Sequence, residues 1–313
     1  MEAANKLLAP TPIQYLETLP GGQEVFIKRD DLLGFSFGGN KCRIGAEFLE
    51  DMRRQGADFM VSYGSRRSNL NRVVASMCKS QGIPCLIISS EEDGEQDGFN
   101  AALVDFMGAG RVFCKKDSVA GTVGNTLQAL RSQGHKPYYI YGDAHGMGNE
   151  ETARSAYRKA YREIRLWQEH AQAEFEAIFL ASGTGMTQGG LLAGKRQQHG
   201  REKIIGISVA REAGPGAAAV RRYAGEGEEE VCFEADYRCG GYGRYDGEIE
   251  GVIQRMMERH GIALDPVYTG KAYAGMLRWL ERYGEGMKKV LFIHTGGLPL
   301  YFDYLNGRMG VGR

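Results

Sequence analysis

The sequence predicts an α/β protein with two doubly wound open sheets and helices on both faces of each. Three times along the 313 residues, a short apolar run is followed by a polar or glycine-containing turn and then by a helical pattern. Strands that alternate with helices are typical of parallel sheets. Because such sheets bind ligands at the carboxyl ends of their strands, the polar turns are expected to meet at one site.

The first of these units combines two predicted strands with one helix. Phe59–Tyr63 is predicted to be a buried strand, Asn69–Ser80 a helix and Cys85–Ile88 the next strand. The turn before the helix reads "RRSN", and both Ser68 and Asn69 are residue types that cap helix N-termini well. This turn is therefore either a plain helix cap or part of a ligand site.

A long amphipathic helix is predicted between the first and second units. In the stretch "ETARSAYRKAYREIRLWQEH", Ala156, Ala160 and Ile164 recur at four-residue spacing while charged residues fill the other positions. A helix of this kind is a candidate bridge between two domains.

The second unit carries a glycine-rich loop, "SGTGMT", between a strand and a helix. Ala177–Leu180 and Ile204–Val209 are predicted to be strands around a helix that starts near Thr187. Glycines at positions 183 and 185 allow the backbone to approach an anion, and the N–H groups of the following helical turn favour a phosphate. No Gly-Lys-Ser/Thr follows at the spacing of a nucleotide P-loop, so an ordinary glycine-rich turn stays open as the alternative.

The third unit is a predicted strand at Val290–His294 that ends in "TGG". Thr295 is therefore expected at the carboxyl end of a strand, like the two earlier turns. Before this unit, the glycine-rich and acidic stretch from 224 to 248 is predicted to be a surface loop that enters a helix at Glu248.

The charge balance argues against binding by bulk electrostatics. The chain has 39 Lys and Arg against 39 Asp and Glu, so no net field attracts nucleic acid or an anionic membrane, and a small molecule is the expected partner. Neither a secretion signal nor a run of about 18 apolar residues is present, so a soluble cytoplasmic protein is expected. Six scattered cysteines without a CxxC pair indicate reduced thiols and no metal site.

Five motifs together resemble the pyridoxal-phosphate enzymes of the tryptophan-synthase β fold, also called fold type II. They are "FGGNK", "RRSN", "SGTGMT", "LDPVYTGKAYAGM" and "HTGGLP", and the likeness runs from the "TPIQYL" segment to the "LPLYFDY" segment. Within these enzymes the chain is most similar to the group of D-cysteine desulfhydrase and 1-aminocyclopropane-1-carboxylate deaminase. The resemblance implies a homodimer, with a large cofactor-binding domain (residues 1–45 and 155–313) and a small inserted domain (residues 46–154).

The resemblance gives Lys41 the central role. It implies that Lys41 binds the cofactor aldehyde covalently and then removes a proton from the substrate, which requires an amine whose pKa is lowered by desolvation and nearby positive charge. Asn69 matches an asparagine that bonds the ring hydroxyl, and Ser68 matches a serine beside the substrate. Thr295 matches a neutral hydroxyl that faces the pyridine nitrogen, an arrangement that favours loss of a β substituent. The residues that match the phosphate-binding loop are Gly183, Thr184, Gly185, Met186 and Thr187.

Two tyrosines and a threonine match the substrate pocket of the family. Tyr242 and Tyr268 correspond to tyrosines that can donate or accept a proton there, although each could instead be a packed ring with a hydrogen bond at its tip. Thr269 stands where the deaminase branch has a glutamate. Its presence argues against cyclopropane ring opening and favours the desulfhydrase-like branch.

The chain departs from the family pattern at several positions. Arg67 replaces a glutamine and either holds a substrate carboxylate or is a surface charge. His145, in the unusual loop "GDAHGMGNE", is a candidate proton carrier or a satisfied loop histidine. Three functions follow as hypotheses: a lyase that acts on a small β-substituted amino acid by α,β-elimination, a synthase that replaces the β substituent, and a catalytically impaired relative that binds pyridoxal phosphate.

Overall fold

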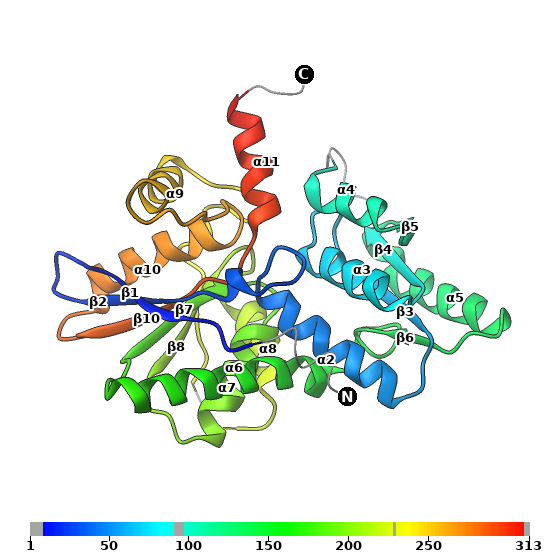
Figure 1. The fold of residues 1–313 in the computed structure, drawn as a ribbon, viewed down its shortest axis with the longest axis horizontal. Coiled ribbons are helices and arrows are strands. Elements are labelled where there is room, and N and C mark those ends of the chain that lie inside the picture. Colours follow the sequence, from blue (N-terminus) through cyan, green and yellow to red (C-terminus); the bar gives the residue numbers. More distant parts are fainter. Residues whose placement is uncertain (1–8, 91–96, 228–229, 310–313) are drawn as a thin grey trace.

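Two largely parallel sheets lie in two separate lobes of the molecule (Figure 1). The structure, a computed structural model, describes residues 9–90, 97–227 and 230–309. Within these ranges the strands are β1 (Ile13–Thr18), β2 (Glu24–Lys28), β3 (Phe59–Tyr63), β4 (Cys85–Ser90), β5 (Gly110–Cys114), β6 (Pro137–Tyr139), β7 (Ala177–Ser182), β8 (Lys203–Ser208), β9 (Cys232–Glu234) and β10 (Lys289–Ile293). The larger sheet has the order β1-β2-β10-β7-β8-β9 and the smaller one β5-β4-β3-β6. Only the β1–β2 pair is antiparallel among the described strands.

Helices cover the sheets and fill the connections between the strands. In the described ranges they are α2 (Asn40–Arg54), α3 (Asn69–Gln81), α4 (Phe99–Phe106), α5 (Val119–Ser132), α6 (Glu150–Ala171), α7 (Met186–Gln197), α8 (Ala213–Ala224), α9 (Gly247–His260), α10 (Thr269–Tyr283) and α11 (Leu298–Met309). Two single turns of 3₁₀ helix, η1 (Asp30–Leu32) and η2 (Lys116–Ser118), lie between strands and helices. No helix in this part of the chain is both long and apolar enough to cross a bilayer.

Both faces of the larger sheet are buried, as β7 demonstrates. Ile178 and Leu180 belong to the apolar cluster formed with α6 and α7, whereas the alternate residues Ala177, Phe179 and Ala181 pack into the cluster formed with α9 and α10. A strand that sends successive side chains into two different cores must lie between two layers of helices. The predicted class of doubly wound open sheets is confirmed.

The smaller sheet is covered on both faces in the same way. Met60 of β3 packs with α2 and α3 in the first apolar cluster, and its neighbour Val61 packs with Val123 and Leu127 of α5. The predicted strand at 59–63 and the predicted helix from Asn69 appear in the structure, the helix one residue longer than expected.

One sequence expectation fails in the acidic stretch that precedes α9. Cys232–Glu234 is not a loop but a short edge strand, β9, paired with β8. Phe233 is buried there, and Gln188 Nε2 donates to the carbonyl oxygen of Cys232 at 2.7 Å. Three residues are too few for a periodic pattern, so only the tertiary contacts reveal the strand. Residues 228 and 229 of the same predicted loop lie outside the described residues.

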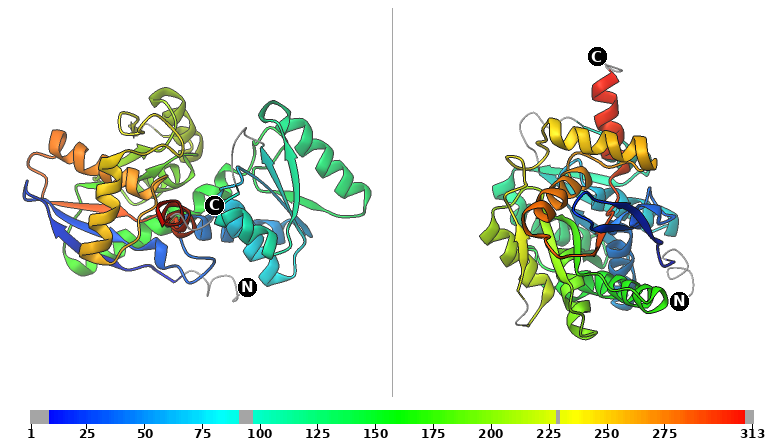
Figure 2. Two further views of the ribbon diagram at one scale, coloured as in Figure 1. Left: turned by 90° about the horizontal axis from the view of Figure 1, so that it is seen from above. Right: turned by 90° about the vertical axis from the view of Figure 1, so that its left-hand side faces the viewer.

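Two helices, α2 and α6, join the lobes that contain the two sheets (Figures 1 and 2). One apolar cluster includes Phe48 of α2, Val74 of α3 and Tyr157 of α6, so the core is continuous across the junction. The predicted domain boundaries after residues 45 and 154 fall inside α2 and α6. Residues 1–8, 91–96 and 310–313 of the predicted domains lie outside the described residues.

Candidate active site

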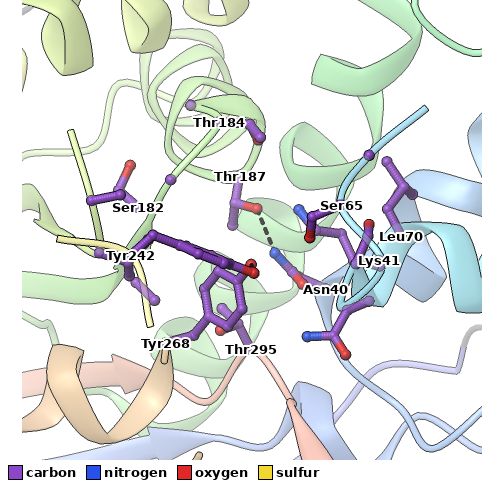
Figure 3. Close-up of a pocket in the computed structure, with 18 of the residues that line it drawn as sticks. Asn40, Lys41, Ser65, Leu70, Ser182, Thr184, Thr187, Tyr242, Tyr268 and Thr295 are labelled. Carbon is purple, nitrogen blue, oxygen red and sulfur yellow. Dashed lines mark hydrogen bonds between the residues drawn. The ribbon is translucent and has the colours of Figure 1, made fainter. Parts of the chain in front are cut away.

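A cavity with a volume of about 340 Å³ lies where the carboxyl ends of strands from both sheets meet (Figure 3). Its wall is built mainly from the ends of strands, the turns that follow them and the first residues of helices, as expected for parallel sheets. The lining residues at or after strand ends are Tyr63, Gly64, Ser65, Ser90, Tyr141, Ser182, Gly183, Val209, Ala210, Arg211, Thr295 and Gly296.

Lys41 reaches this cavity from the second position of α2. The helix begins after Gly39, which has φ of 100°, and a Cβ there would lie 2.7 Å from the carbonyl oxygen of Thr295. Only glycine allows this approach. The backbone N–H of Asn40 also donates to that oxygen at 3.1 Å. The start of α2 is thus held against the turn after β10, which places Lys41 and Thr295 on the same cavity.

The Lys41 amine is shifted towards its neutral form. Burial lowers the pKa of Lys41 from 10.5 to about 8, because the charged form loses hydration in the cavity wall. A shift of this direction makes the amine a better nucleophile and base near neutral pH. The shift agrees with the direction expected for a lysine that does chemistry, and burial is its cause.

The loop "SGTGMT" turns into the N-terminus of α7 at the cavity. Gly185 is the N-cap with φ of 90°, and a Cβ there would lie within 2.8 Å of the Ala219 backbone. Gly183, Thr184, Gly185 and Thr187 line the cavity, so the N-terminus of α7 lies at this end of it, an arrangement that favours an anion. Thr187 Oγ1 accepts a hydrogen bond of 2.8 Å from Asn40 Nδ2, drawn in Figure 3. This bond ties the anion loop to the residue beside Lys41.

Asn69 has its carboxamide oriented by a layer of residues behind it. Its Oδ1 accepts from Asn100 Nδ2 at 3.0 Å and from Arg72 Nη2 at 3.4 Å. Because the oxygen is engaged, the amide nitrogen is the end that remains to donate into the cavity. Ser68, which also lines the cavity, caps α3 by accepting from the backbone N–H of Asn71 at 3.2 Å. Capping and a place at the cavity therefore coexist at Ser68.

Two tyrosines approach the cavity from the larger lobe, opposite Asn40, Lys41 and Ser65 in Figure 3. The hydroxyls of Tyr242 and Tyr268 lie 3.1 Å apart, with their rings edge to face. Burial and the Tyr242 hydroxyl raise the pKa of Tyr268 well above its usual range, so it remains a neutral donor.

The turn that carries Tyr268 is held by a buried carboxylate. Asp265 Oδ1 accepts from the backbone N–H groups of Val267 and Tyr268 at 2.9 and 2.8 Å. Asp265 Oδ2 accepts from the Thr269 hydroxyl at 2.8 Å. The three contacts close the turn before α10 and direct Tyr268 towards the cavity.

Four residues singled out from the sequence do not line the cavity. Thr269 is fully buried and its hydroxyl bonds Asp265. Met186 is buried in the apolar core at the start of α7. The carbonyl of Arg67 accepts from Asn100 while its guanidinium lies outside the lining. His145 lies in an exposed turn, where its backbone N–H donates to Asp143.

The structure adds lining residues that the sequence interpretation missed. Asn40 was inside a quoted motif but had no assigned role, although it bonds Thr187. Ser65, Tyr141 and Arg211 follow strands of the two parallel sheets, so the rule that ligands bind at strand ends would have indicated them. Lys116, at the start of η2, is a further cation on the cavity wall.

The cavity wall is rich in hydroxyls and amines and lacks acids. No aspartate or glutamate is among its lining residues in the part of the chain that the structure describes. Within the same part, no group of three His, Cys, Asp or Glu side chains could hold a metal ion. Its chemistry therefore suits a ligand that brings negative charge.

These residues fit pyridoxal phosphate. That compound carries an aldehyde, a ring hydroxyl, a pyridine nitrogen and a phosphate, and the cavity offers a matching group for each. The amine of Lys41 matches the aldehyde, the Asn69 amide the ring hydroxyl, the Thr295 hydroxyl the nitrogen and the N-terminus of α7 the phosphate. All four come from separate elements that the fold brings to one cavity.

Comparisons with known proteins agree with this fit. The chain is 36% identical over 94% of its length to a provisionally named 1-aminocyclopropane-1-carboxylate deaminase of Pyrococcus horikoshii, of which it covers 91%. It is 31% identical over 95% of its length to a D-cysteine desulfhydrase of Klebsiella pneumoniae, of which it covers 94%. The crystal structure of an ACC deaminase homologue superimposes with a TM-score of 0.82 at 31% identity, covering 97% of this chain and 94% of that one.

A second solved structure shares the fold at lower identity. The structure of O-ureido-L-serine synthase has a TM-score of 0.68 at 17% identity and covers the whole of this chain and 97% of the other. The family model described as pyridoxal-phosphate dependent enzyme matches residues 5–296. This match spans most of the chain and includes Lys41, the loop before α7 and Thr295. The chain therefore belongs to the family of pyridoxal-phosphate dependent enzymes.

Proposed function

We propose that the protein is a pyridoxal-phosphate dependent lyase that acts on a small β-substituted amino acid by α,β-elimination, as D-cysteine desulfhydrase does. One observation carries the proposal. A lysine with a lowered pKa, a neutral threonine hydroxyl, an oriented asparagine amide and a helix N-terminus share one acid-free cavity. The relatives named above support the same class of reaction.

The cofactor would be held by the groups that fit it. In this proposal Lys41 binds its aldehyde, Asn69 its ring hydroxyl and Thr295 its nitrogen, while residues 183–187 bind its phosphate through backbone N–H groups and hydroxyls. When bound, pyridoxal phosphate supplies the electron sink that acidifies the α-carbon of an attached amino acid. Every other step falls to side chains of the protein.

Lys41 is the residue that moves the proton. With cofactor and substrate in the cavity, the Lys41 amine would be placed to take the proton from the α-carbon of the substrate. The electron pair of the broken C–H bond would then form a Cα–Cβ double bond, while the Cβ–S bond breaks and the sulfur leaves with its electron pair. Water would hydrolyse the resulting unsaturated product to a keto acid and ammonia. Tyr242 and Tyr268, whose hydroxyls touch each other at the cavity, are placed to donate a proton to the leaving thiolate. Ser68 and the first N–H groups of α3 lie where they could hold the substrate carboxylate.

The acid-free cavity favours a desulfhydrase over a ring-opening deaminase. Thr269 occupies the position at which the deaminase branch has a glutamate, and its hydroxyl is committed to Asp265 behind the wall. No carboxylate among the described lining residues could take its place as a second base. Elimination of a thiol needs only one base and a proton donor, and the cavity provides both.

The test is a product assay on the purified protein with pyridoxal phosphate. D-cysteine, L-cysteine, O-acetylserine and 1-aminocyclopropane-1-carboxylate are offered separately, and sulfide, keto acid and ammonia are measured. We expect equal amounts of sulfide, pyruvate and ammonia from one enantiomer of cysteine, and none from the cyclopropane substrate. A Lys41→Ala variant with no product from either enantiomer is the control.

Other outcomes identify the two alternatives. If an added thiol or amine suppresses the keto acid and a new amino acid forms, the enzyme is a β-replacement synthase. If the cofactor binds, with its visible absorption band, and no amino acid changes that band, the protein is a catalytically impaired relative. Either result would replace the proposed lyase.

The assembly and its location form part of the same proposal. We infer a cytoplasmic homodimer with a large domain (1–45 and 155–313) and a small one (46–154). The six cysteines are all free in the structure, as in a reducing compartment. The family resemblance supports the dimer, and the separate sheets of the two lobes support the domains. Sedimentation velocity at two protein concentrations tests the dimer.

A further inference from the structure

Behind the cavity wall lies a buried lysine that the proposed reaction does not use. Lys271, in α10, has no exposed surface. Its Nζ donates to the carbonyl oxygens of Val209, Arg238 and Gly241 at 3.0, 2.8 and 2.8 Å. A lysine ammonium has three N–H donors, so these three backbone oxygens satisfy it completely.

The three carbonyls belong to different parts of the cavity wall. Val209 follows β8 and lines the cavity itself. Arg238 and Gly241 belong to the glycine-rich loop that carries Tyr242, the next residue along the chain. Tyr268, the partner of Tyr242, precedes α10 by one residue and Lys271 by three. One side chain therefore connects the strand end, the Tyr242 loop and the helix that follows Tyr268.

The charge of Lys271 is what makes the contact strong. Burial lowers the pKa of Lys271 to about 8, although the nearby Asp265 and Asp246 act in the opposite direction. Three carbonyl acceptors also favour the charged form. At neutral pH, below this pKa, the side chain is mainly an ammonium ion. Hydrogen bonds from a charged donor are stronger than those between neutral groups. Three such bonds in a buried position tie the loop to α10 and to the end of β8.

The other contacts around Tyr242 come from the surface side of the loop and from the neighbouring core. Tyr237 and Cys239 pack against the apolar cluster of α9 and α10, and the Tyr242 hydroxyl bonds that of Tyr268. The tyrosine is 40% exposed, and its ring touches Tyr268 only edge on. The ion pair of Arg238 with Glu212 is solvent-exposed, and such pairs contribute little. The Cys239 thiol meets Asp246 at 3.4 Å, a weak contact.

We propose that Lys271 is a positioning residue, which clamps residues 238–241 against the end of β8 and thereby holds Tyr242 beside Tyr268 at the cavity. It touches neither substrate nor cofactor. It acts through Tyr242, and its removal should loosen this loop first and disturb the reaction second. The kinetic part of the test rests on the proposed function, but the structural part does not.

Limited proteolysis tests the structural part directly. Trypsin cleaves after arginine, and Arg238 and Arg244 lie in or next to the clamped loop. We expect Lys271→Gln, which keeps donors but loses the charge, to speed cleavage at these two arginines by at least about tenfold, because cleavage follows the population of the opened loop. Cleavage elsewhere should keep its rate. Lys79→Gln, the same change at an exposed lysine near the end of α3, is the matched control.

A double-mutant cycle tests the path through Tyr242. The kcat/KM for cysteine is measured for Lys271→Gln, Tyr242→Phe and the double variant. If Lys271 acts through Tyr242, the double variant loses less than the product of the two single losses. Multiplying losses, or tryptic cleavage at Arg238 and Arg244 that matches the wild type in a folded Lys271→Gln protein, would overturn the proposal. A wild type without activity on cysteine would overturn the proposed function only, since the cleavage rates still decide the clamp.

Discussion

Two groups of buried cations in the molecule are held in opposite ways. In the first group, carboxylates surround the cations at the base of α2. Glu163 Oε2 accepts from Lys28 Nζ at 2.6 Å, and Arg43 contacts both Glu163 Oε1 at 2.6 Å and Asp30 Oδ1 at 3.0 Å. In the described part of the chain, neutral groups accept the hydrogen bonds of the second group, and two of these acceptors, Asn69 and Val209, line the cavity.

Arg72 and Lys271 make up this second group. Arg72 is only 1% exposed, yet its guanidinium donates to Asn100 Oδ1 and Ser36 Oγ at 2.9 Å each, and to Asn69 Oδ1 at 3.4 Å. Burial lowers the pKa of Arg72 to about 10. The carbonyl cage of Lys271 follows the same pattern.

This difference suggests two roles. The cations paired with carboxylates stabilise the fold, and the cations bound by neutral groups orient residues of the site. Burial would raise the pKa of Asp30, but the charges of Arg43 and Lys28 outweigh it and hold that pKa well below its usual range. Removing one member of such a set leaves an uncompensated buried charge, which is strongly destabilising. When a buried cation is bound only by neutral groups, no counter-charge offsets its desolvation. Its hydrogen bonds fix the orientation of the groups that accept them. One acceptor of Arg72 is Asn69, and the loop clamped by Lys271 carries Tyr242.

The largest effect is expected from Lys41, whose pKa is lowered by burial alone. Lys41→Ala should remove the visible absorption band of the bound cofactor and lower kcat by a factor of about 10⁴ or more, because both a covalent and a proton-transfer role are lost. Absorption spectra and sulfide release check this. Lys79→Ala should behave like the wild type. An active Lys41→Ala protein would contradict the assignment of the reactive amine.

The next effect is on stability and tests the cations that are paired with carboxylates, Lys28 and Arg43. Asp30→Ala should lower the free energy of unfolding by about 3–5 kcal/mol, because Arg43 and Lys28 lose a buried counter-charge. Urea unfolding measures it. Asp105→Ala, which breaks an exposed pair with Arg111, should cost only about 0.2–1 kcal/mol. Equal losses of unfolding free energy in the two variants would show that the buried ion pairs of Asp30 contribute no more to stability than an exposed pair.

Acid should weaken the same network. Because the folded-state pKa of Asp30 is depressed, its contribution to stability is present above its unfolded pKa, about 3.9, and is lost as the pH falls below that value. The wild type should therefore lose more stability between about pH 5 and pH 3 than Asp30→Ala does. Thermal unfolding of both proteins across this range is the measurement. Parallel pH profiles would rule out the role given to Asp30.

The sequence predicted local elements and motif residues, but not the buried cations compared above. Local patterns indicated β3, α3 and α6, because periodic burial leaves a trace within a few residues. Lys41, Asn69, Thr295 and the loop before α7 were found through family motifs, and all of them reach the cavity. Contacts between distant segments leave no such trace.

Arg72 and Lys271 illustrate the limit. An arginine or lysine in a helix is usually exposed, so nothing in their surroundings along the chain indicates burial. Arg72 meets Asn100 across 28 residues, and Lys271 meets Val209 across 62. The same reason explains why β9, which pairs with the distant strand β8, could be found only in the structure.

A smaller effect is expected when the guanidinium behind Asn69 is removed. Arg72→Met should raise the dissociation constant for pyridoxal phosphate by about tenfold, since Asn69 loses part of its orientation, while leaving no buried charge unpaired. Its stability loss should be smaller than that of Asp30→Ala. Fluorescence titration with the cofactor and urea unfolding give the two numbers. Arg53→Met, at an exposed position of α2, is the control, and unchanged cofactor affinity in Arg72→Met would contradict the positioning role.

The smallest effect is a pH dependence that reports the amine of Lys41 itself. Capture of the cofactor aldehyde needs the neutral amine, and burial lowers the pKa of Lys41 to about 8. The rate at which the cofactor-free protein takes up pyridoxal phosphate should rise about fivefold from pH 7 to 8 and less than about twofold from pH 8 to 9. An unhindered lysine amide, with a pKa of about 10.4, should keep rising through this range. Stopped-flow absorbance measures both.

The lowered pKa of Lys41 also affects stability. Between about pH 8 and 10.4 the unfolded chain keeps a proton that folded Lys41 has lost, so the free energy of unfolding increases as the pH rises through this range. If the capture rate instead rose with pH as it does for the free amine, the cavity would not desolvate Lys41. Lys41 would then not belong with the buried cations that lack a carboxylate partner.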